Sequence, residues 1–531
     1  MIYRLPNYLL AILSGLLLSA AWFSPLTILI FIAWVPLLVL EDKISNSQTI
    51  KLKRLALTGF SYLTFFIWNL AVTWWIYYAS FGGAALAIIC NAILMCVTFM
   101  MWRTLKRRLN KPWAIWLLIP IWLGFEYGHT LWDLTWTWLT LGNVFAFNHN
   151  WVQWYEFTGT SGGSLWVLIV NILIFNLIKT HSYRLQQFVK PIAIIIVPIT
   201  VSHLILSFEP QSENLNQHMY KTVIVQPNVD PYNEKFYFEP EIQLQNLLKQ
   251  IHGKLDSTVD FLVLPETFLT EDIFEGKEKE SFSFHFLQDS ILKKFPQLTI
   301  ITGANTVYTY KPGEKLSPTA SKYSNADEYY DSYNTGLQIN KDGFVRYHKS
   351  KLVPGVEKMP FPTLFKPLES LAIDLGGTMG SLGMQDERTV FFSHNKQVGI
   401  APVICYESVY PDYIGDYIRN GANFIFIITN DGWWQNTPGH RQHLAYAKLR
   451  AIETRKEIAR CANTGISCFI TPYGKIEQAT PYWEEAVIIK KMTPHNEQTF
   501  FVRFGDLISY SSAFLAILLV LWGQVLRFKK S

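Results

Sequence analysis

Residues 399–407 read Gly-Ile-Ala-Pro-Val-Ile-Cys-Tyr-Glu, an apolar run that ends on Cys405, a tyrosine and Glu407. A short apolar run bounded by polar residues is typical of a buried strand in an α/β sheet. Residues 261–266 have the same form, since Phe-Leu-Val-Leu-Pro leads directly to Glu266. Active sites of α/β folds collect at the ends of strands, so these two endings predict the position of a functional site.

A third stretch, Arg-Tyr-His-Lys-Ser-Lys over residues 346–351, places Lys349 and Lys351 after a predicted strand. Taken singly, each ending has an ordinary explanation: the carboxylate caps a helix, the lysines are solvated, and the cysteine fills space. Together they supply a nucleophile, a base and a cation in one domain, which indicates nucleophilic catalysis.

Around these endings, residues 218–503 alternate short β-rich runs with amphipathic helices, which predicts an α/β sheet fold with helices on its faces. The expected strands are Thr222–Gln226, Phe261–Leu264, Leu298–Thr302, Gly336–Ile339, Val398–Ile404, Phe424–Thr429 and Ile466–Thr471, and the expected helices include Glu239–His252 and Arg441–Arg460.

The rest of the chain has the composition of a membrane protein. Only 16% of all residues are charged, against about 25% in soluble proteins. A membrane-spanning helix needs about 20 mostly apolar residues. Candidates lie at about 7–23, 25–40, 56–78, 83–102, 112–128, 161–178, 191–207 and 507–526. We therefore expect about eight spans: a seven-span N-terminal membrane domain (1–210), and a C-terminal span with its tail (504–531).

Basic segments follow the second, fourth, sixth and eighth predicted spans, whereas the loops after the first, third and fifth contain no lysine or arginine. Positively charged loops stay in the cytoplasm. Both termini are therefore expected on the cytoplasmic side of a bacterial inner membrane, with residues 218–503 on the periplasmic side. Because the positive charges mark topology, the formal net charge of +5 does not indicate a nucleic-acid partner.

Three motifs carry a resemblance to a known family. Leu-Pro-Glu266, Tyr-x-Lys349-x-x-Leu-Val-Pro and Ile-Cys405-Tyr-Glu407 occur in the order seen in the nitrilase (carbon–nitrogen hydrolase) superfamily. In that superfamily an αββα sandwich carries a Glu–Lys–Cys triad. Glu357, the flanking spans and the Thr-Asn-Asp-Gly-Trp segment at 429–433 more narrowly resemble the apolipoprotein N-acyltransferase family.

The narrower resemblance covers nearly the whole chain. It implies transfer of a fatty acyl chain from a membrane phospholipid to the N-terminal amine of a diacylglyceryl-cysteine lipoprotein, through a thioester on the enzyme. The implied partners are the phospholipid donor, the lipoprotein acceptor and the membrane. We expect a monomer that needs no cofactor and no metal.

The resemblance also implies residue roles. Cys405 is the nucleophile, and Glu266 is the general base, whose pKa we expect partial burial to raise. Lys349 stabilises the oxyanion together with a backbone N–H near Tyr406. Lys351 is the alternative cation, but the family pattern places the lysine two residues after the tyrosine, which selects Lys349.

Supporting roles are expected for further residues. Glu357 and Glu407 are expected to orient Lys349 or the amine, with structural ion pairs as the alternative. The aromatic or polar residues Phe236, Asn430 and Trp433 are expected near the substrate, with loop packing as the alternative for the 430–434 segment. The chain departs from the common pattern at two places, with Gly355-Val356 after Leu-Val-Pro and Phe236 after Lys235.

For four remaining residues we expect structural roles. His440 and His443 are expected to make caps or core hydrogen bonds, because no third metal ligand has suitable spacing. Cys461 and Cys468 are expected to be buried thiols.

Two other functions stay open. A membrane-tethered carbon–nitrogen hydrolase (amidase) would use water as the acceptor. A transporter or receptor with a degenerate enzyme-like domain is less compatible with an intact triad, since a binding module has no need of all three groups.

Overall fold

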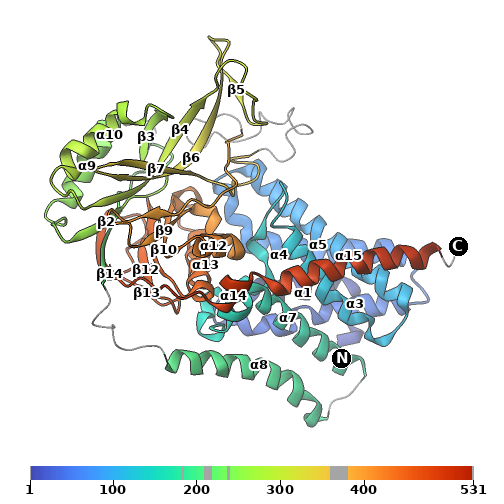
Figure 1. The fold of residues 1–531 in the computed structure, drawn as a ribbon. Helices are drawn as coiled ribbons and strands as arrows, with labels where there is room; N and C mark the ends of the chain where they lie inside the picture. Colours follow the sequence, from blue (N-terminus) through green and yellow to red (C-terminus); the bar gives the residue numbers. More distant parts are fainter. Residues whose placement is uncertain (1, 181–183, 209–217, 236–238, 359–380, 529–531) are drawn as a thin grey trace. The chain divides into compact units, whose positions relative to one another are not determined.

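A computed structural model describes residues 2–180, 184–208, 218–235, 239–358 and 381–528 (Figure 1). Its internal contacts divide the chain into two compact units. The helical unit comprises residues 1–77, 84–209 and 504–531, and the sheet unit comprises residues 78–83 and 210–503.

The helical unit consists of long apolar helices joined by short connections. Its helices are α1 (Asn7–Ala20), α2 (Ile30–Ala33), α3 (Val35–Asn46), α4 (Lys53–Thr73), α5 (Phe81–Leu109), α6 (Leu118–Gly128), α7 (Tyr155–Lys179), α8 (Leu185–Ser207) and α15 (Leu507–Phe528). Within this unit α1 packs on α4, and α15 packs on α6.

Among the described residues, five helical stretches are long and apolar enough to cross a membrane: Lys53–Tyr78, Phe81–Leu109, Tyr155–Lys179, Gln186–Ser207 and Leu507–Val525. They correspond to five of the expected spans. The other three fall on α1, on the broken pair α2 and α3, and on α6, which are shorter helices. A membrane bundle is therefore supported, while the count of eight spans stays a prediction.

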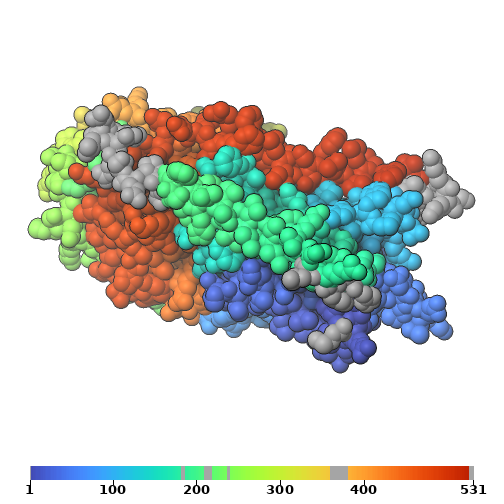
Figure 2. All heavy atoms as spheres, turned by 90° about the horizontal axis from the view of Figure 1, so that it is seen from below, coloured from blue at the N-terminus to red at the C-terminus, as the bar shows by residue number. Residues whose placement is uncertain are grey.

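Helix α8 exposes a large apolar surface. Its apolar side chains include Val189, Ile196 and Val197, each more than half exposed, and its green atoms lie at the surface in Figure 2. An apolar helix of this length that leaves such side chains uncovered is suited to face lipid.

The sheet unit contains two sheets with helices on their outer faces, so the expected αββα sandwich is confirmed (Figure 1). The first sheet has the order β14-β1-β2-β4-β6-β5, with β3 paired to β4 and β7 to β6, and the second has the order β13-β12-β11-β10-β9-β8. The first-sheet strands are β1 (Tyr220–Gln226), β2 (Val259–Val263), β3 (Leu269–Phe274), β4 (Thr299–Thr309), β5 (Ser321–Lys322), β6 (Tyr329–Asn340), β7 (Gly343–His348) and β14 (Ala486–Met492). The second-sheet strands are β8 (Phe391–Phe392), β9 (Gly399–Ile404), β10 (Ala422–Thr429), β11 (Glu457–Ala462), β12 (Cys468–Ile470) and β13 (Ile476–Glu477).

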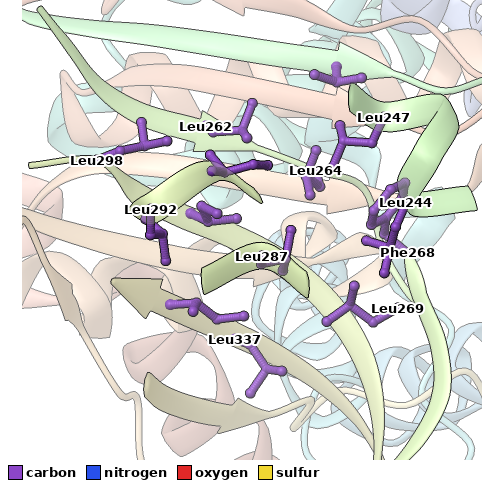
Figure 3. Packing of buried hydrophobic residues seen from close by; sticks show 14 of the residues in the cluster. Leu244, Leu247, Leu262, Leu264, Phe268, Leu269, Leu287, Leu292, Leu298 and Leu337 are labelled. Atoms are coloured by element: carbon purple, nitrogen blue, oxygen red, sulfur yellow. The ribbon is translucent and has the colours of Figure 1, made fainter. Parts of the chain in front are cut away.

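The central strands are buried on both faces, which explains their nearly continuous apolar sequence. On one face, Leu262 and Leu264 join a cluster with Leu244 and Leu247 of α9 (Pro240–Ile251), as Figure 3 shows. On the other face, the ring of Phe261 lies 5.4 Å from that of Phe426 in β10, which ties the two sheets together.

One expected element is wrong. Residues 441–460 do not form a single helix, because α13 (Pro438–Thr454) ends at Arg455, whose φ of 50° is left-handed. The chain then forms β11, which pairs parallel to β10 and antiparallel to β12. All residues of β11 are buried, so sheet pairing and burial decide the structure there.

Candidate active site

The sandwich brings the predicted strand endings together. Cys405 follows β9, whose last residue, Ile404, pairs with Ile428 in the parallel strand β10. Glu266 follows β2 in the other sheet. Cys405 itself has φ 48°, and Thr267, directly after Glu266, has φ 47°. Each side chain is therefore presented at a sharp left-handed turn, a conformation that residues with a β-carbon rarely adopt.

Gly303 in β4 leaves room for the Glu266 turn. A β-carbon at this position would lie 2.3 Å from Thr267 N and 2.6 Å from Glu266 Cα. Gly303 N also donates to the carbonyl of Pro265 at 3.0 Å. A glycine is required here because the backbone of the Glu266 turn passes too close for any side chain.

The carboxylate of Glu266 is held by three donors. Lys349 Nζ donates to its Oε1 at 3.0 Å, and Asn334 Nδ2 donates to the same oxygen at 2.8 Å. The backbone N–H of Asn430 donates to Oε2 at 3.1 Å. Lys349 Nζ also donates to Glu357 Oε1 at 2.7 Å. Two carboxylates and one ammonium thus form a compact buried cluster.

The expected rise of the Glu266 pKa is wrong. Burial does act in that direction, but the charges of Lys349 and Lys235 and the Asn334 hydrogen bond outweigh it and lower the pKa of Glu266. The expectation considered burial alone, and the sequence does not reveal how many donors converge on one carboxylate. Glu266 is therefore ionised at neutral pH and able to accept a proton.

Cys405 has the opposite electrostatic environment. Burial raises the pKa of its thiol, the Glu266 carboxylate raises it further, and Lys349 opposes the rise. The thiol is therefore protonated at rest. The residue is 9% exposed. A protonated thiol beside an ionised carboxylate is the arrangement in which a proton moves as the sulfur attacks.

Of the two competing lysines, Lys349 is the one at the carboxylate. Burial acts to lower the pKa of Lys349, but Glu266 and Glu357 together raise it well above its ordinary value. The ammonium is therefore a permanent positive charge. Lys351 instead places its Nζ 5.1 Å from the centre of the Tyr410 ring.

The two supporting glutamates behave differently. Glu357 contacts the Lys349 ammonium as expected, and its Oε2 accepts from Val353 N at 2.8 Å. Glu407 accepts from the Tyr347 hydroxyl at 2.5 Å and from the backbone N–H of Ser350 and Ile404. It therefore braces the chain next to Lys349 and Cys405, where the expectation had it orienting the Lys349 ammonium or the amine.

The remaining expected residues divide as follows. Tyr406 is buried directly after Cys405, and Asn430 contacts Glu266 through its backbone. The ring of Trp433 is partly buried and lies 5.2 Å from that of Tyr232. Phe236 lies outside the described residues.

Two residues at the site were not predicted from the sequence to have a functional role. Asn334 of β6 bridges the two carboxylates, donating to Glu266 at 2.8 Å and to Glu357 at 3.3 Å. Lys235 donates to the backbone carbonyl of Glu266 at 2.9 Å and to the Thr267 hydroxyl. Burial lowers the pKa of Lys235 to about 8, and the electrostatic interactions with Glu266 and Cys405 oppose this shift. The pairing of Lys235 with Phe236 was a signal for the lysine, whereas no pattern marked Asn334.

The residues with expected structural roles can also be compared with the structure. Cys461 and Cys468 are buried free thiols, as expected. His443 makes core hydrogen bonds to Asp431 and Ser408. Within the described part of the chain, no group of His, Cys, Asp and Glu side chains is arranged to hold a metal ion.

Known proteins match both parts of the chain. Residues 223–499 match the carbon-nitrogen hydrolase family, and residues 14–173 match the apolipoprotein N-acyltransferase N-terminal domain. The apolipoprotein N-acyltransferase of Chlorobaculum tepidum is 27% identical over 98% of this chain and 96% of its own length. That of Geobacter metallireducens is 24% identical over 95% of this chain and 93% of its own length. A solved nitrilase-superfamily protein of Saccharomyces cerevisiae has a TM-score of 0.37 and 19% identity, covering 53% of this chain and 93% of that one.

Proposed function

The chain belongs to the carbon–nitrogen hydrolase family, and on that premise we propose that it is an apolipoprotein N-acyltransferase that uses Cys405, Glu266 and Lys349 as catalytic residues. One observation carries the proposal. Ionised Glu266 contacts the Lys349 ammonium in a buried cluster, and the charges of both groups shift the pKa of the Cys405 thiol. The matched N-terminal domain adds the membrane part that a soluble amidase lacks.

The first half-reaction transfers the acyl chain to the enzyme. Cys405 Sγ attacks the ester carbonyl carbon of a phospholipid while its proton passes to Glu266. Lys349 and the Tyr406 N–H stabilise the oxyanion that forms. As the tetrahedral intermediate collapses, the ester C–O bond breaks and Glu266 returns the proton to the leaving alkoxide. A lysophospholipid departs and a thioester remains on Cys405.

The second half-reaction transfers the acyl chain to the lipoprotein. The uncharged N-terminal amine of a diacylglyceryl-cysteine lipoprotein attacks the thioester carbon, and Glu266 takes a proton from the amine. The C–S bond then breaks, an amide forms, and the thiolate regains its proton from Glu266. Glu357 keeps Lys349 in place through both steps, because it shares the ammonium with Glu266.

Joining the site to membrane helices suits this substrate. Moving a long acyl chain into water costs about 0.8 kcal/mol per CH₂ group. A catalytic unit tethered to the bilayer by its own spans lets the chain stay in hydrocarbon during transfer. Phe236, Asn430 and Trp433 are proposed to contact the donor or the acceptor.

The proposed location is the bacterial inner membrane, with both termini in the cytoplasm and the sheet unit in the periplasm. What supports this orientation is the alternation of basic loops with loops that contain no lysine or arginine. The enzyme is proposed to act as a monomer without a nucleic-acid partner.

The decisive experiment measures the intact mass of the purified protein after incubation with phospholipid. We expect wild type to gain the mass of one acyl chain, removable by hydroxylamine, and Cys405→Ala to gain none. If phospholipid is consumed while neither protein gains mass, Cys405 is not the nucleophile.

A second measurement separates the transferase from the amidase-type hydrolase. The acyl-enzyme is isolated and mixed with buffer alone or with a diacylglyceryl-cysteine peptide that has a free amine. A transferase loses its acyl group much faster with the peptide and yields the N-acyl product. Equal loss in both mixtures, with free fatty acid as the product, supports the hydrolase instead.

A further inference from the structure

A second buried cluster of charged and polar side chains adjoins the backbone of Cys405. Asp431, His443 and Arg460 have side chains with no solvent exposure. They come from the start of η11 (Asp431–Trp434), from α13 and from β11. Arg460 pairs with Asp431 Oδ2, and His443 Nδ1 lies 3.0 Å from Asp431 Oδ1. Burial alone would raise the pKa of Asp431, but Arg460 and His443 hold it well below its ordinary value.

His443 connects this cluster to the backbone of Cys405. Its Nε2 lies 3.1 Å from the Cys405 carbonyl oxygen and 2.8 Å from Ser408 Oγ. Both contacts fit a hydrogen on Nε2, because the carbonyl oxygen can only accept and Ser408 Oγ can accept the same hydrogen. Ser408 Oγ donates to the same carbonyl at 2.8 Å. The Cys405 carbonyl is thus held from two directions inside the protein.

Holding this carbonyl determines more than the position of Cys405. The carbonyl of Cys405 and the N–H of Tyr406 belong to one planar trans peptide, in which they point in opposite directions. Fixing the oxygen toward His443 therefore fixes the Tyr406 N–H to point away from the buried cluster. The φ of 48° at Cys405 is uncommon for a residue with a β-carbon, so contacts around Cys405 are needed to hold its backbone.

We propose that His443, anchored on Asp431, is a positioning residue that aims the Tyr406 N–H at the oxyanion by holding the Cys405 carbonyl. The inference rests on the proposed acyl transfer, since it assigns the geometry of the oxyanion donor in that reaction. It makes His443 act on the transition state without touching the substrate.

The chain offers a matched control on the same helix. His440 lies one turn earlier in α13 and is equally buried. Its ring stacks on Tyr482, with centroids 4.2 Å apart. A general loss of packing in α13 would follow substitution of either histidine, whereas loss of the peptide restraint should follow only substitution of His443.

The test compares His443→Gln with His443→Asn in the full-length, detergent-solubilised enzyme. Glutamine can place its amide nitrogen near the position of Nε2, and asparagine places its nitrogen near Nδ1. We expect His443→Asn to slow acyl-enzyme formation at saturating phospholipid by about 100-fold, as misplaced catalytic groups do. KM for the phospholipid should stay unchanged, and His443→Gln should recover most of the rate. His440→Asn should acylate like wild type.

Alkylation of Cys405 by iodoacetamide, followed on the Cys405 peptide, supplies the second readout. This displacement forms no oxyanion, so its rate should be the same in wild type and both His443 variants. A faster alkylation in His443→Asn would show that the site had opened, and the positioning role would be rejected. Equal acylation rates in the two His443 variants, or an equal loss in His440→Asn, would also overturn it.

Two further measurements test the positioning role of His443. Ser408→Ala removes the other donor to the same carbonyl, and we expect it to slow acylation in the same way but to a smaller degree. If wild type forms no thioester with phospholipid, the proposed function fails, but acylation by an activated ester such as p-nitrophenyl acetate still passes through an oxyanion. The ranking of the His443 variants with that ester then tests the positioning role separately.

Discussion

Two clusters of buried charge lie in the same sandwich, and they differ in what they leave available. In the Glu266–Lys349–Glu357 cluster the ammonium is buried, yet both carboxylate side chains keep about a tenth of their exposure. In the Asp431–His443–Arg460 cluster every side chain is fully enclosed. Charges that must exchange protons with substrates need an opening, whereas charges that hold a backbone are better sealed. The proposed function places the chemistry in the first cluster and gives the second a supporting role.

The largest expected effect comes from removing the base in the open cluster. Glu266→Gln keeps the size of the side chain and an oxygen to accept from Lys349, but it cannot take a proton. We expect acyl-enzyme formation to slow by about 100- to 10,000-fold, the usual contribution of a general base. Single-turnover mass spectrometry measures the rate, and the apparent melting temperature in detergent should fall less than in Asp431→Asn, because Lys349 keeps Glu357 as a partner.

Glu241→Gln, at an exposed site on α9, is the matched control for Glu266→Gln. A wild-type rate is expected for it. If Glu266→Gln also acylated at the wild-type rate, the open cluster would not contain the base.

Breaking the sealed cluster should instead lower stability. Asp431→Asn leaves Arg460 and His443 buried without their carboxylate, and removing one partner of a buried ion pair costs about 3–5 kcal/mol. We expect a large fall in the apparent melting temperature, measured by intrinsic fluorescence. A variant that melted like wild type while losing activity would place Asp431 among the chemical groups and remove the distinction between the clusters.

How well the sequence predicts each cluster depends on whether its members follow a recognisable local pattern. Glu266, Lys349 and Cys405 each follow a strand, and strand endings converge in an α/β fold, so their meeting could be expected. The contact of His443 with the Cys405 carbonyl depends on the packing of α13 against η10 (Cys405–Val409), which no local pattern specifies. Asn334 is likewise one polar residue among several in β6.

The two errors have physical causes of the same kind. Arg455 adopts a left-handed φ, which at the end of a helix is common for glycine but not for arginine. The residue type therefore did not predict the end of α13. The direction of the Glu266 pKa shift depends on the number of donors around the carboxylate, and sequence analysis could estimate only its burial.

A third substitution tests whether the open cluster depends on its backbone turn. Gly303→Ala would place a β-carbon 2.6 Å from Glu266 Cα, so the turn that carries the carboxylate must shift. We expect acylation to slow by about 100-fold, since small displacements of catalytic groups have effects of that size. Gly253→Ala, where nothing lies within 4 Å of the new carbon, controls for a glycine substitution that meets no neighbour. Because Gly253 has φ +67°, this control carries backbone strain alone. Equal rates in the two variants would mean that crowding at Gly303 does not displace Glu266.

The smallest expected effect distinguishes two buried lysines, Lys235 and Lys456. The pKa of each is lowered to about 8, but their surroundings differ. Burial lowers the pKa of Lys235 to about 8 beside Glu266, and burial also lowers that of Lys456 to about 8, where Nζ donates to the carbonyls of His495 and Glu497. The ordinary lysine pKa is about 10.5. Between pH 8 and 10.5 the unfolded chain therefore binds more protons than the folded one, and stability rises with pH in this window.

Replacing either lysine with methionine should remove part of that rise, seen as a flatter plot of melting temperature against pH. Only Lys235→Met should also alter the pH dependence of Cys405 alkylation, because Lys235 and Cys405 interact electrostatically. Alkylation is measured from pH 7 to 10 on the Cys405 peptide. Lys235 carries its charge mainly below pH 8, so Lys235→Met should alkylate more slowly than wild type below that pH and at the wild-type rate well above it. The same slowing in Lys456→Met would mean that general destabilisation, and not proximity to the site, controls the thiol.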